Sequence, residues 1–192
     1  NIPFNDDVKA IAENTQAVCW GSLAQRNVVS RESIYRFLDA TPEDCMKIFD
    51  INLRQDFYTK DVICESMKRC NVLKINDEEL LLIRPMFGLE GTDEEVCRWF
   101  MKQFNLRYVI LTAGAEYSTI YAEDESSTLP TPKVTVADTV GAVHQHAGRH
   151  GGSFVASILA GKSLREAHER AVKVAAFVCT QHGAWPTYPK EL

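Results

Sequence analysis

Short apolar runs separated by longer amphipathic segments recur along the whole chain. The runs contain many β-branched and aromatic residues and end at glycine or polar residues, which is typical of buried strands. They predict strands over Ala17–Trp20, Met46–Phe49, Val72–Ile75, Tyr108–Thr112 and Thr119–Ala122, the last two paired as a hairpin. A further β-branched run covers Val134–Val136.

Apolar residues at helical spacing fill most of the segments between these runs. The pattern predicts helices over Val8–Glu13, from Ser30 through Leu38, over Asp61–Cys70, Asp77–Leu82 and Thr92–Phe104, and a last helix that Ser163 caps. Thr92 followed by Glu95 has the spacing of a capping box. The acidic, Ser- and Pro-bearing segment from Glu123 to Pro132 is predicted to be a loop.

Strands that alternate with helices predict an α/β fold. Because the strands are continuous apolar runs, they should form a mostly parallel sheet covered on both faces, as a three-layer sandwich. Residues 1–192 would form a single domain, and no linker or internal repeat interrupts the pattern. Ligands of such sheets bind beyond the carboxyl ends of the strands, so the polar residues at those ends are the candidates for function.

Composition excludes several classes of protein. The chain has 192 residues and a formal net charge of −5, which argues against a nucleic-acid-binding surface. No apolar run reaches the roughly 18 residues of a membrane span, and the first residues lack the pattern of a secretory signal. We therefore expect a cytoplasmic protein without membrane or nucleic-acid partners. The six cysteines form no C-x-x-C pairs, which favours reduced, buried thiols over disulfides or a metal site.

Two polar stretches directly follow predicted strands. Asp50, Asn52 and Arg54 alternate, so on an extended strand end they would face one side. Arg54 suits an anion, although a solvated strand end with an Asp–Arg pair would look the same. After the next strand, Asn76 and Glu79 lie in an acidic stretch that suits water-mediated contact with Mg²⁺, or simply a first helical turn that the helix dipole favours.

The strongest candidate for phosphate chemistry runs from Asp138 to Phe154. It joins a β-branched run to a helical pattern through a glycine-rich turn, and such turns offer free backbone amides and the positive end of a helix dipole to an anion. By itself the turn could be a plain connection.

Several short motifs lie along the chain: ADTVGA at 137–142 and the following SF pair, the D-x-N-x-R at 50–54, the N-x-x-E at 76–79, Thr112-Ala113-Gly114 and the VCTQ-x-GA at 178–184. They resemble the motifs of the pfkB (ribokinase-like) carbohydrate kinases. Together with GSLAQR at 21–26, these stretches are most similar to bacterial fructokinases. They span almost the entire chain in the family's order.

The resemblance implies a cofactor, ATP with Mg²⁺, and a set of site residues. Gly141, Ala142, Arg54, Thr112 and Gly114 would border the phosphates, and Asn76 and Glu79 would organise Mg²⁺ through water without direct ligation. Asp50 and Asn52 would lie on the sugar side, and Gly183 and Ala184 would wall the adenine. Tyr117 stands where the family has a second glycine, so a position that needs positive φ would be strained there.

The family's catalytic aspartate has no counterpart. In the family it follows the glycine-rich turn, whereas this chain has Val143 to Gly152 there and no carboxylate between Asp138 and Glu166. Two hypotheses follow: a fructokinase-like phosphotransferase that is inactive or impaired, or a noncatalytic nucleotide-binding or oligomerising remnant. His144, His146 and His150 in this stretch favour a solvent-facing insertion over a zinc site, with phosphate attraction alongside Arg149 as a third possibility.

The resemblance also covers only the C-terminal portion of the family's pattern. The first strands, the lid and the G-G-x-x-x-N sugar motif of the family have no counterpart in these 192 residues. Binding of a sugar by this chain alone is therefore doubtful. A sheet edge without those strands would be exposed, so we expect a homo-oligomer or a partner chain that covers it.

Overall fold

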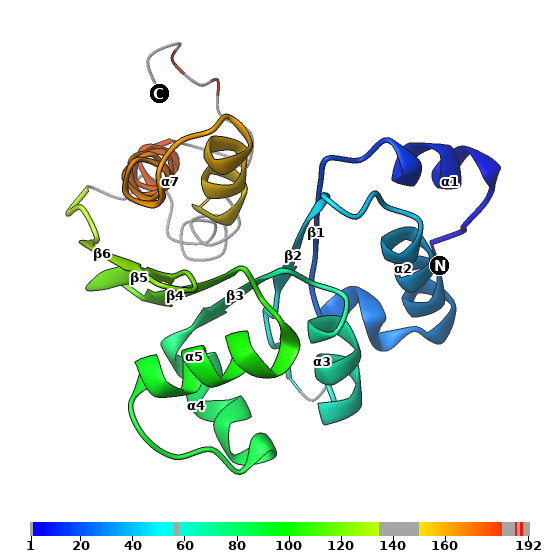
Figure 1. Ribbon diagram of the computed structural model, residues 1–192, viewed down its shortest axis with the longest axis horizontal. Coiled ribbons are helices and arrows are strands. Elements are labelled where there is room, and N and C mark those ends of the chain that lie inside the picture. Colours follow the sequence, from blue (N-terminus) through cyan, green and yellow to red (C-terminus); the bar gives the residue numbers. More distant parts are fainter. Residues whose placement is uncertain (1, 56–57, 135–149, 182–186, 188, 190–192) are drawn as a thin grey trace. The chain divides into compact units, whose positions relative to one another are not determined.

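The computed structural model describes residues 2–55, 58–134, 150–181, 187 and 189. Residue contacts divide the chain into two compact units, Asn1–Val109 and Ile110–Leu192. The fold is α/β, with six strands in the order β1-β2-β3-β4-β5-β6 flanked by helices (Figure 1). The pairs β1–β2 and β2–β3 are parallel and β5–β6 is antiparallel, so the predicted mostly parallel sheet is confirmed.

The first unit alternates strands and helices as the apolar runs predict. Its elements are α1 (Asp6–Glu13), β1 (Ala17–Trp20), the 3₁₀ turn η1 (Leu23–Arg26), α2 (Val28–Asp39), β2 (Met46–Asp50), α3 (Lys60–Met67), β3 (Val72–Asn76), α4 (Asp77–Ile83), η2 (Arg84–Phe87), α5 (Asp93–Phe104) and the start of β4 (Tyr108–Ala113). Strands β2 and β3 are buried along nearly their whole length, which explains their continuous apolar sequences.

The second unit combines the end of β4 with β5 (Tyr117–Tyr121), β6 (Ser126–Pro130), a helix over residues 150–159 and α7 (Leu164–Cys179). Ser163 caps α7, as predicted, with its hydroxyl accepting from the Glu166 amide. The predicted loop over Glu123–Pro132 is wrong, because Ser126–Pro130 form a strand that pairs with β5. The predicted strand over Val134–Val136 lies almost wholly outside the described residues.

Helix boundaries follow the capping side chains. Thr92 caps α5 in the predicted capping box with Glu95. The predicted start of the second helix at Ser30 is wrong: α2 begins at Val28, because the side chain of Asn27 accepts from the amides of Val29 and Ser30. Ser30 is buried, and its hydroxyl accepts from the amide of Ile2.

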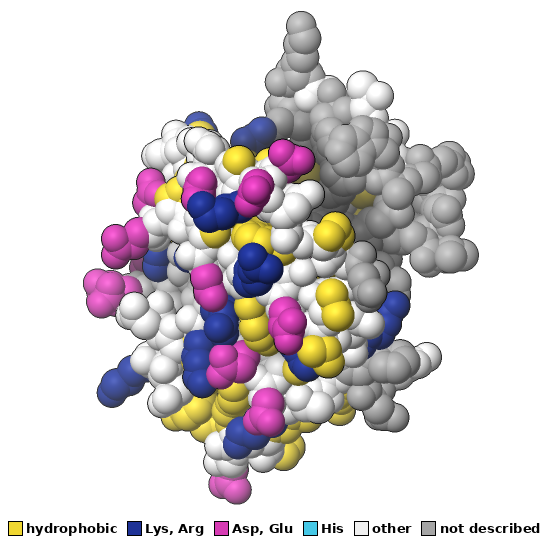
Figure 2. All heavy atoms as spheres, turned by 90° about the vertical axis from the view of Figure 1, so that its right-hand side faces the viewer, with side chains coloured by type: hydrophobic (Ala, Val, Ile, Leu, Met, Phe, Trp, Pro, Cys, Tyr) yellow, Lys and Arg dark blue, Asp and Glu magenta, His cyan; other side chains and the backbone are white. Residues whose placement is uncertain are grey.

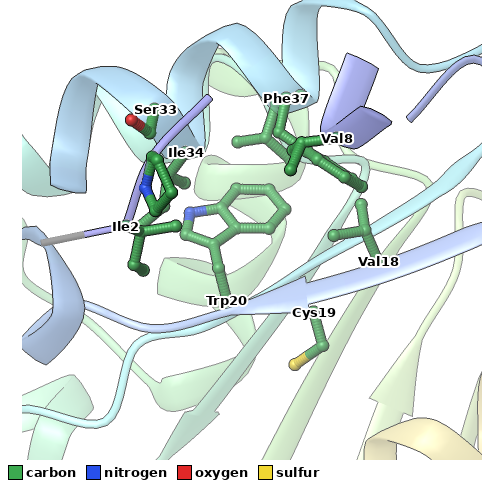
Figure 3. Close-up of a pocket in the computed structure, with 10 residues that line it drawn as sticks. Ile2, Val8, Val18, Cys19, Trp20, Ser33, Ile34 and Phe37 are labelled. Atoms are coloured by element: carbon green, nitrogen blue, oxygen red, sulfur yellow. The ribbon is translucent and has the colours of Figure 1, made fainter. Parts of the chain in front are cut away.

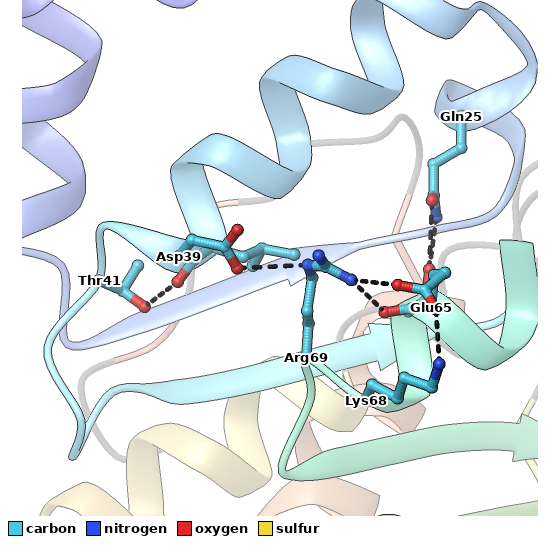
Figure 4. A network of polar contacts seen from close by, with 8 residues as sticks. Gln25, Asp39, Thr41, Glu65, Lys68 and Arg69 are labelled. Carbon is cyan, nitrogen blue, oxygen red and sulfur yellow. Dashed lines mark hydrogen bonds and ion pairs between the residues drawn. The ribbon is translucent and has the colours of Figure 1, made fainter.

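Polar contacts tie α2 to α3 within the first unit (Figure 4). Arg69 donates to Asp39 at 3.2 Å and to Glu65 at 2.8 Å. The amide of Gln25, which is fully buried, donates to the hydroxyl of Ser66 at 2.9 Å. A buried amide that reaches a partner on another helix fixes the relative positions of η1 and α3.

The described surface is mixed in charge. On the face drawn in Figure 2, Lys and Arg side chains are interspersed with Asp and Glu side chains, and hydrophobic side chains lie between them. All six cysteines are free, and Cys45, Cys70, Cys97 and Cys179 are buried. No helix in the described part of the chain is both long and apolar enough to span a bilayer.

Candidate functional site

A buried ion pair joins the last residue of β2 to the middle of β3. Lys74 Nζ donates to Asp50 Oδ1 at 3.0 Å, and the lysine is only 2% exposed. Asp50 is more accessible, with a side-chain exposure of 17%. A charge is costly to bury without a partner, so Asp50 stabilises the buried Lys74. The pair lies near the carboxyl ends of the strands, where ligands of parallel sheets bind. Lys74 was missed by the sequence reasoning, although a lysine inside an apolar strand was a usable signal.

Glu79 connects two chain segments beside this pair. Its Oε2 accepts from the Asn76 amide at 3.0 Å, while the Asn76 side chain accepts from the Glu79 amide at 2.7 Å, which makes a capping box. Its Oε1 accepts from the amide of Leu53 at 2.9 Å. Glu79 therefore fastens the loop after β2 to the start of α4.

The surroundings of Glu79 shift the pKa of its carboxyl group. Burial of the 8% exposed side chain raises the pKa of its carboxyl, and the hydrogen bonds from the backbone of Asn76 and Leu53 oppose that rise. The charges of Lys74 and Asp50 also act on it, in opposite directions. Glu79 therefore lies within electrostatic reach of the Lys74–Asp50 pair.

The loop after β2 departs from the expected extended strand end. Strand β2 ends at Asp50, and Asn52 and Gln55 have φ of 40° and 46°, in the left-handed region. Asp50, Asn52 and Arg54 therefore do not share one face through strand alternation, and that part of the prediction is wrong. Asn52 is exposed and Arg54 half-buried. The hydroxyl of Ser22, which is almost fully buried, donates to the carbonyl oxygen of Asn52 at 3.2 Å.

Gly21 lets two strand ends approach closely. A Cβ at this position would lie 3.1 Å from the carbonyl oxygen of Asp50. Close packing at the end of β1 therefore favours glycine at this position.

The remaining predicted residues lie in the second unit. Thr112 belongs to β4, and Gly114, with φ of 48°, follows the strand in a turn. Tyr117 is the first residue of β5 and has no positive φ, so the strain expected there is absent. Gly141, Ala142, Gly183 and Ala184 lie outside the described residues, as do His144, His146 and Arg149.

A buried polar cluster in the second unit was also missed. His168 on α7 shares hydrogen bonds with the hydroxyls of Ser118 and Ser127, each 2.9 Å long, and Ser118 also lies 3.3 Å from His150 Nε2. Both histidines are at most 1% exposed. His150, which lies in the helix described over residues 150–159, is therefore not in a solvent-facing insertion, and that interpretation is wrong for it. Burial lowers the pKa of His168 to about 4.

The described side chains show whether a metal ion could be bound directly or through water. No three His, Cys, Asp or Glu side chains among them gather into a set that could hold a metal ion directly. Each oxygen of Glu79 accepts one backbone hydrogen bond and has capacity for another. The arrangement fits a carboxylate that meets a hydrated cation through water. The side-chain oxygen of Asn76 accepts one hydrogen bond in the capping box and likewise keeps a second lone pair.

A parallel sheet with a buried ion pair and a buried carboxylate near the carboxyl ends of adjacent strands has these groups where α/β proteins generally bind their ligands. Comparison with known proteins specifies the class further. The model of the pfkB family carbohydrate kinases matches residues 2–191. The chain belongs to this family.

Relatives in the family are sugar kinases. A fructokinase of Rhizobium leguminosarum bv. trifolii is 28% identical over 160 residues, which cover 80% of this chain and 45% of the relative. A putative sugar kinase of Pyrococcus horikoshii is 26% identical over 203 residues, which cover 100% of this chain and 59% of the relative. The structure of a fructokinase with bound ATP from Xylella fastidiosa matches with a TM-score of 0.75 at 18% identity, covering 91% of this chain and 58% of that chain. The chain thus spans about half the length of the proteins it matches.

Proposed function

We propose that this chain binds MgATP as a member of a fructokinase-like group of sugar kinases, and that its own capacity for phosphoryl transfer to a sugar hydroxyl is impaired or lost. The single observation that carries the binding proposal is the buried Lys74–Asp50 pair near the carboxyl ends of β2 and β3, together with the buried Glu79 that holds the loop after β2. Family membership and the ATP-bound fructokinase of similar fold support the same ligand.

Lys74 supplies a fixed positive charge for an anionic ligand. Its partner in the structure is Asp50, at 3.0 Å. A phosphate or an ionised substrate group that approaches Asp50 would share Lys74 with it, since an ammonium has three donors. Arg54, half-buried in the loop that Glu79 holds, provides a second cation with a planar fork suited to phosphate. Asp50 and Asn52 are proposed to face the sugar.

Mg²⁺ is proposed to sit beyond Glu79, with water between them. Mg²⁺ keeps several of its waters and prefers oxygen partners, and a carboxylate with spare acceptor capacity can order those waters. When bound, the ion would neutralise charge on the nucleotide phosphates. In this proposal Glu79 and Asn76 position waters and hold the loop, and Gly141, Ala142, Thr112 and Gly114 border the phosphates. Gly183 and Ala184 wall the adenine.

Impaired transfer follows from the sequence of the glycine-rich turn. No Asp or Glu stands between Asp138 and Glu166, so the segment from Val143 to Gly152 offers no carboxylate to accept a proton from a sugar hydroxyl. A general base contributes roughly 10²–10⁴-fold to such reactions. Asp138 precedes the turn, where we expect it to brace the backbone. A noncatalytic nucleotide-binding role is therefore the second candidate function.

Calorimetric titration with MgATP and a coupled assay with fructose test the proposal together. We expect saturable binding of MgATP without measurable turnover. Arg54→Gln should weaken MgATP at least tenfold, because a charge-assisted contact contributes about 1.5–3 kcal/mol. The matched control is Arg98→Gln on α5, where the arginine pairs with Glu94, and its affinity should stay within about twofold of the parent. Absence of saturable binding refutes the binding proposal, and steady turnover of fructose refutes the impairment.

Self-association is the further part of this proposal. Strand β1 stands at one end of the strand order, and unpaired strand edges tend to recruit another chain. Exposed Val28 and Val29 on α2 add apolar surface in the same unit. We propose a homo-oligomer or a partner chain at this edge, in a cytoplasmic protein. Light scattering that finds a stable, well-folded monomer at all concentrations contradicts it.

A further inference from the structure

A pocket lies within the first unit, between the N-terminal segment, β1 and α2. Its volume is about 200 Å³. The lining side chains are almost all apolar and come from all three segments: Ile2, Pro3, Val8, Val18, Cys19, Trp20, Ser33, Ile34, Phe37 and Leu38. Figure 3 shows the indole of Trp20 between α2 and the strand, while the side chain of Cys19 points away from it.

Trp20 is held rigidly in this pocket. Its ring stacks on Phe49, with centroids 5.8 Å apart and planes at 26°, and the two residues are register partners on β1 and β2. Phe49 is fully buried and Trp20 is only 7% exposed. The indole therefore presents a fixed wall to the pocket.

The indole N–H of Trp20 is a buried donor without an acceptor. Its nitrogen has no hydrogen-bond partner among the residues that the structure describes. A buried donor left unpaired costs about 1–3 kcal/mol, and buried Trp N–H groups usually find a partner. In Figure 3 the nitrogen points toward the wall that Ile2 forms, and Ile2 is 46% exposed, so a small shift of this surface side chain would open the donor to a ligand.

We propose that this pocket binds a small, mostly hydrophobic molecule that carries one hydrogen-bond acceptor, such as a ketone or ether oxygen, and that the acceptor takes the indole N–H of Trp20. An apolar cavity of roughly 150 Å³ accommodates benzene, so the pocket has room for about eight non-hydrogen atoms. Its apolar lining excludes a nucleotide or a sugar, which would leave many polar groups unpaired. The site is therefore separate from the one proposed for MgATP.

Titration with cyclohexanone, with benzene as the probe that lacks a carbonyl, tests the proposal by two-dimensional ¹H–¹⁵N NMR of the whole chain. Cyclohexanone should bind with an affinity on the order of 1 mM and shift the Trp20 indole proton downfield. In Trp20→Phe, which keeps an aromatic wall but lacks the donor, cyclohexanone should bind about fivefold more weakly, and benzene within about twofold of the parent. The matched control is Trp99→Phe on α5, which should leave both affinities unchanged.

A filled pocket provides the second variant. Val18→Phe places a ring in the space and should abolish the binding of both probes, with folding checked in the same spectra. The proposal is overturned if neither probe causes saturable shifts of the lining residues, if Val18→Phe still binds, or if Trp20→Phe binds cyclohexanone as tightly as the parent. Because MgATP should neither compete with the probes nor depend on these variants, failure here is distinct from failure of the proposed nucleotide site.

Discussion

Removal of the Glu79 side chain should destabilise the protein far more than removal of its counterpart in α5. Glu79 and Glu95 both occupy the third position of a helix that begins with three acidic residues, and both complete a capping box. They differ in burial: Glu79 is 8% exposed and also accepts from the amide of Leu53, whereas Glu95 is exposed and bonds only within its own box. The pair therefore isolates the effect of burial and of the additional loop contact.

The magnitude follows from the contacts. Glu79→Ala leaves the amides of Leu53 and Asn76 without their acceptor in a part-buried setting, at about 1–1.5 kcal/mol each, so about 2–3 kcal/mol in total. Glu95→Ala leaves the amide of Thr92 without its acceptor at an exposed position, where water can replace it, and should cost about 0.5 kcal/mol. With a slope of about 2 kcal/mol per M of urea, the midpoint for Glu79→Ala should fall by about 1 M and that for Glu95→Ala by about a quarter of that.

Urea denaturation followed by far-UV circular dichroism measures both midpoints. Glu79→Gln should lie between the parent and Glu79→Ala, because an amide has one acceptor oxygen for two donors. Equal losses for Glu79→Ala and Glu95→Ala would refute the reasoning, since they would mean that the contact to Leu53 contributes nothing.

Two further predictions concern titration and packing. Burial lowers the pKa of His168 to about 4, against 6.5 in the unfolded chain. Below pH 6.5 the unfolded state therefore binds more protons than the folded state. The free energy of unfolding consequently decreases as the pH falls from 6.5 toward 4. The loss should be about 2 kcal/mol at pH 5. The difference between the urea midpoints at pH 7 and pH 5 should be smaller in His168→Gln than in the parent. An equal difference in the two proteins would contradict the assignment. Gly21→Ala should cost about 1 kcal/mol, because its Cβ would meet the Asp50 carbonyl at 3.1 Å, whereas Gly152→Ala, with no atom within 4 Å and a helical position, should be neutral or stabilising in thermal unfolding.

Elements with strong local signals were predicted well. The four apolar runs from Ala17 to Thr112 became β1 to β4 within a residue or two, and Thr92 and Ser163 cap the helices that they were predicted to cap. Strand β6 was missed because Ser126–Pro130 has few apolar residues and ends in proline. Its stability comes from the ladder with β5 and from the hydroxyl contact of Thr119 with Thr128, neither of which is visible in a local window.

The candidate site was predicted as a set of positions, and its geometry was not. Because β2 and β3 pair in parallel, their last residues, Asp50 and Asn76, lie at the same end of the sheet. The left-handed turn at Asn52, the bond from the Leu53 amide to Glu79 and the burial of Lys74 arise from contacts between segments far apart in sequence. Residues with a family resemblance could thus be named from the sequence, while Lys74, Ser118 and His168 emerged only in three dimensions.

The sequence by itself determined the succession of β1 to β5 with the helices between them, the mostly parallel character of the sheet and the lack of a carboxylate between Asp138 and Glu166, because these depend on local periodicity or on composition. Tertiary structure decided which polar groups are buried together: Lys74 with Asp50, His168 with Ser118, and the unpaired indole of Trp20 beside its pocket. The physical reason is that desolvation is set by what packs around a group, and the packing partners come from distant parts of the chain.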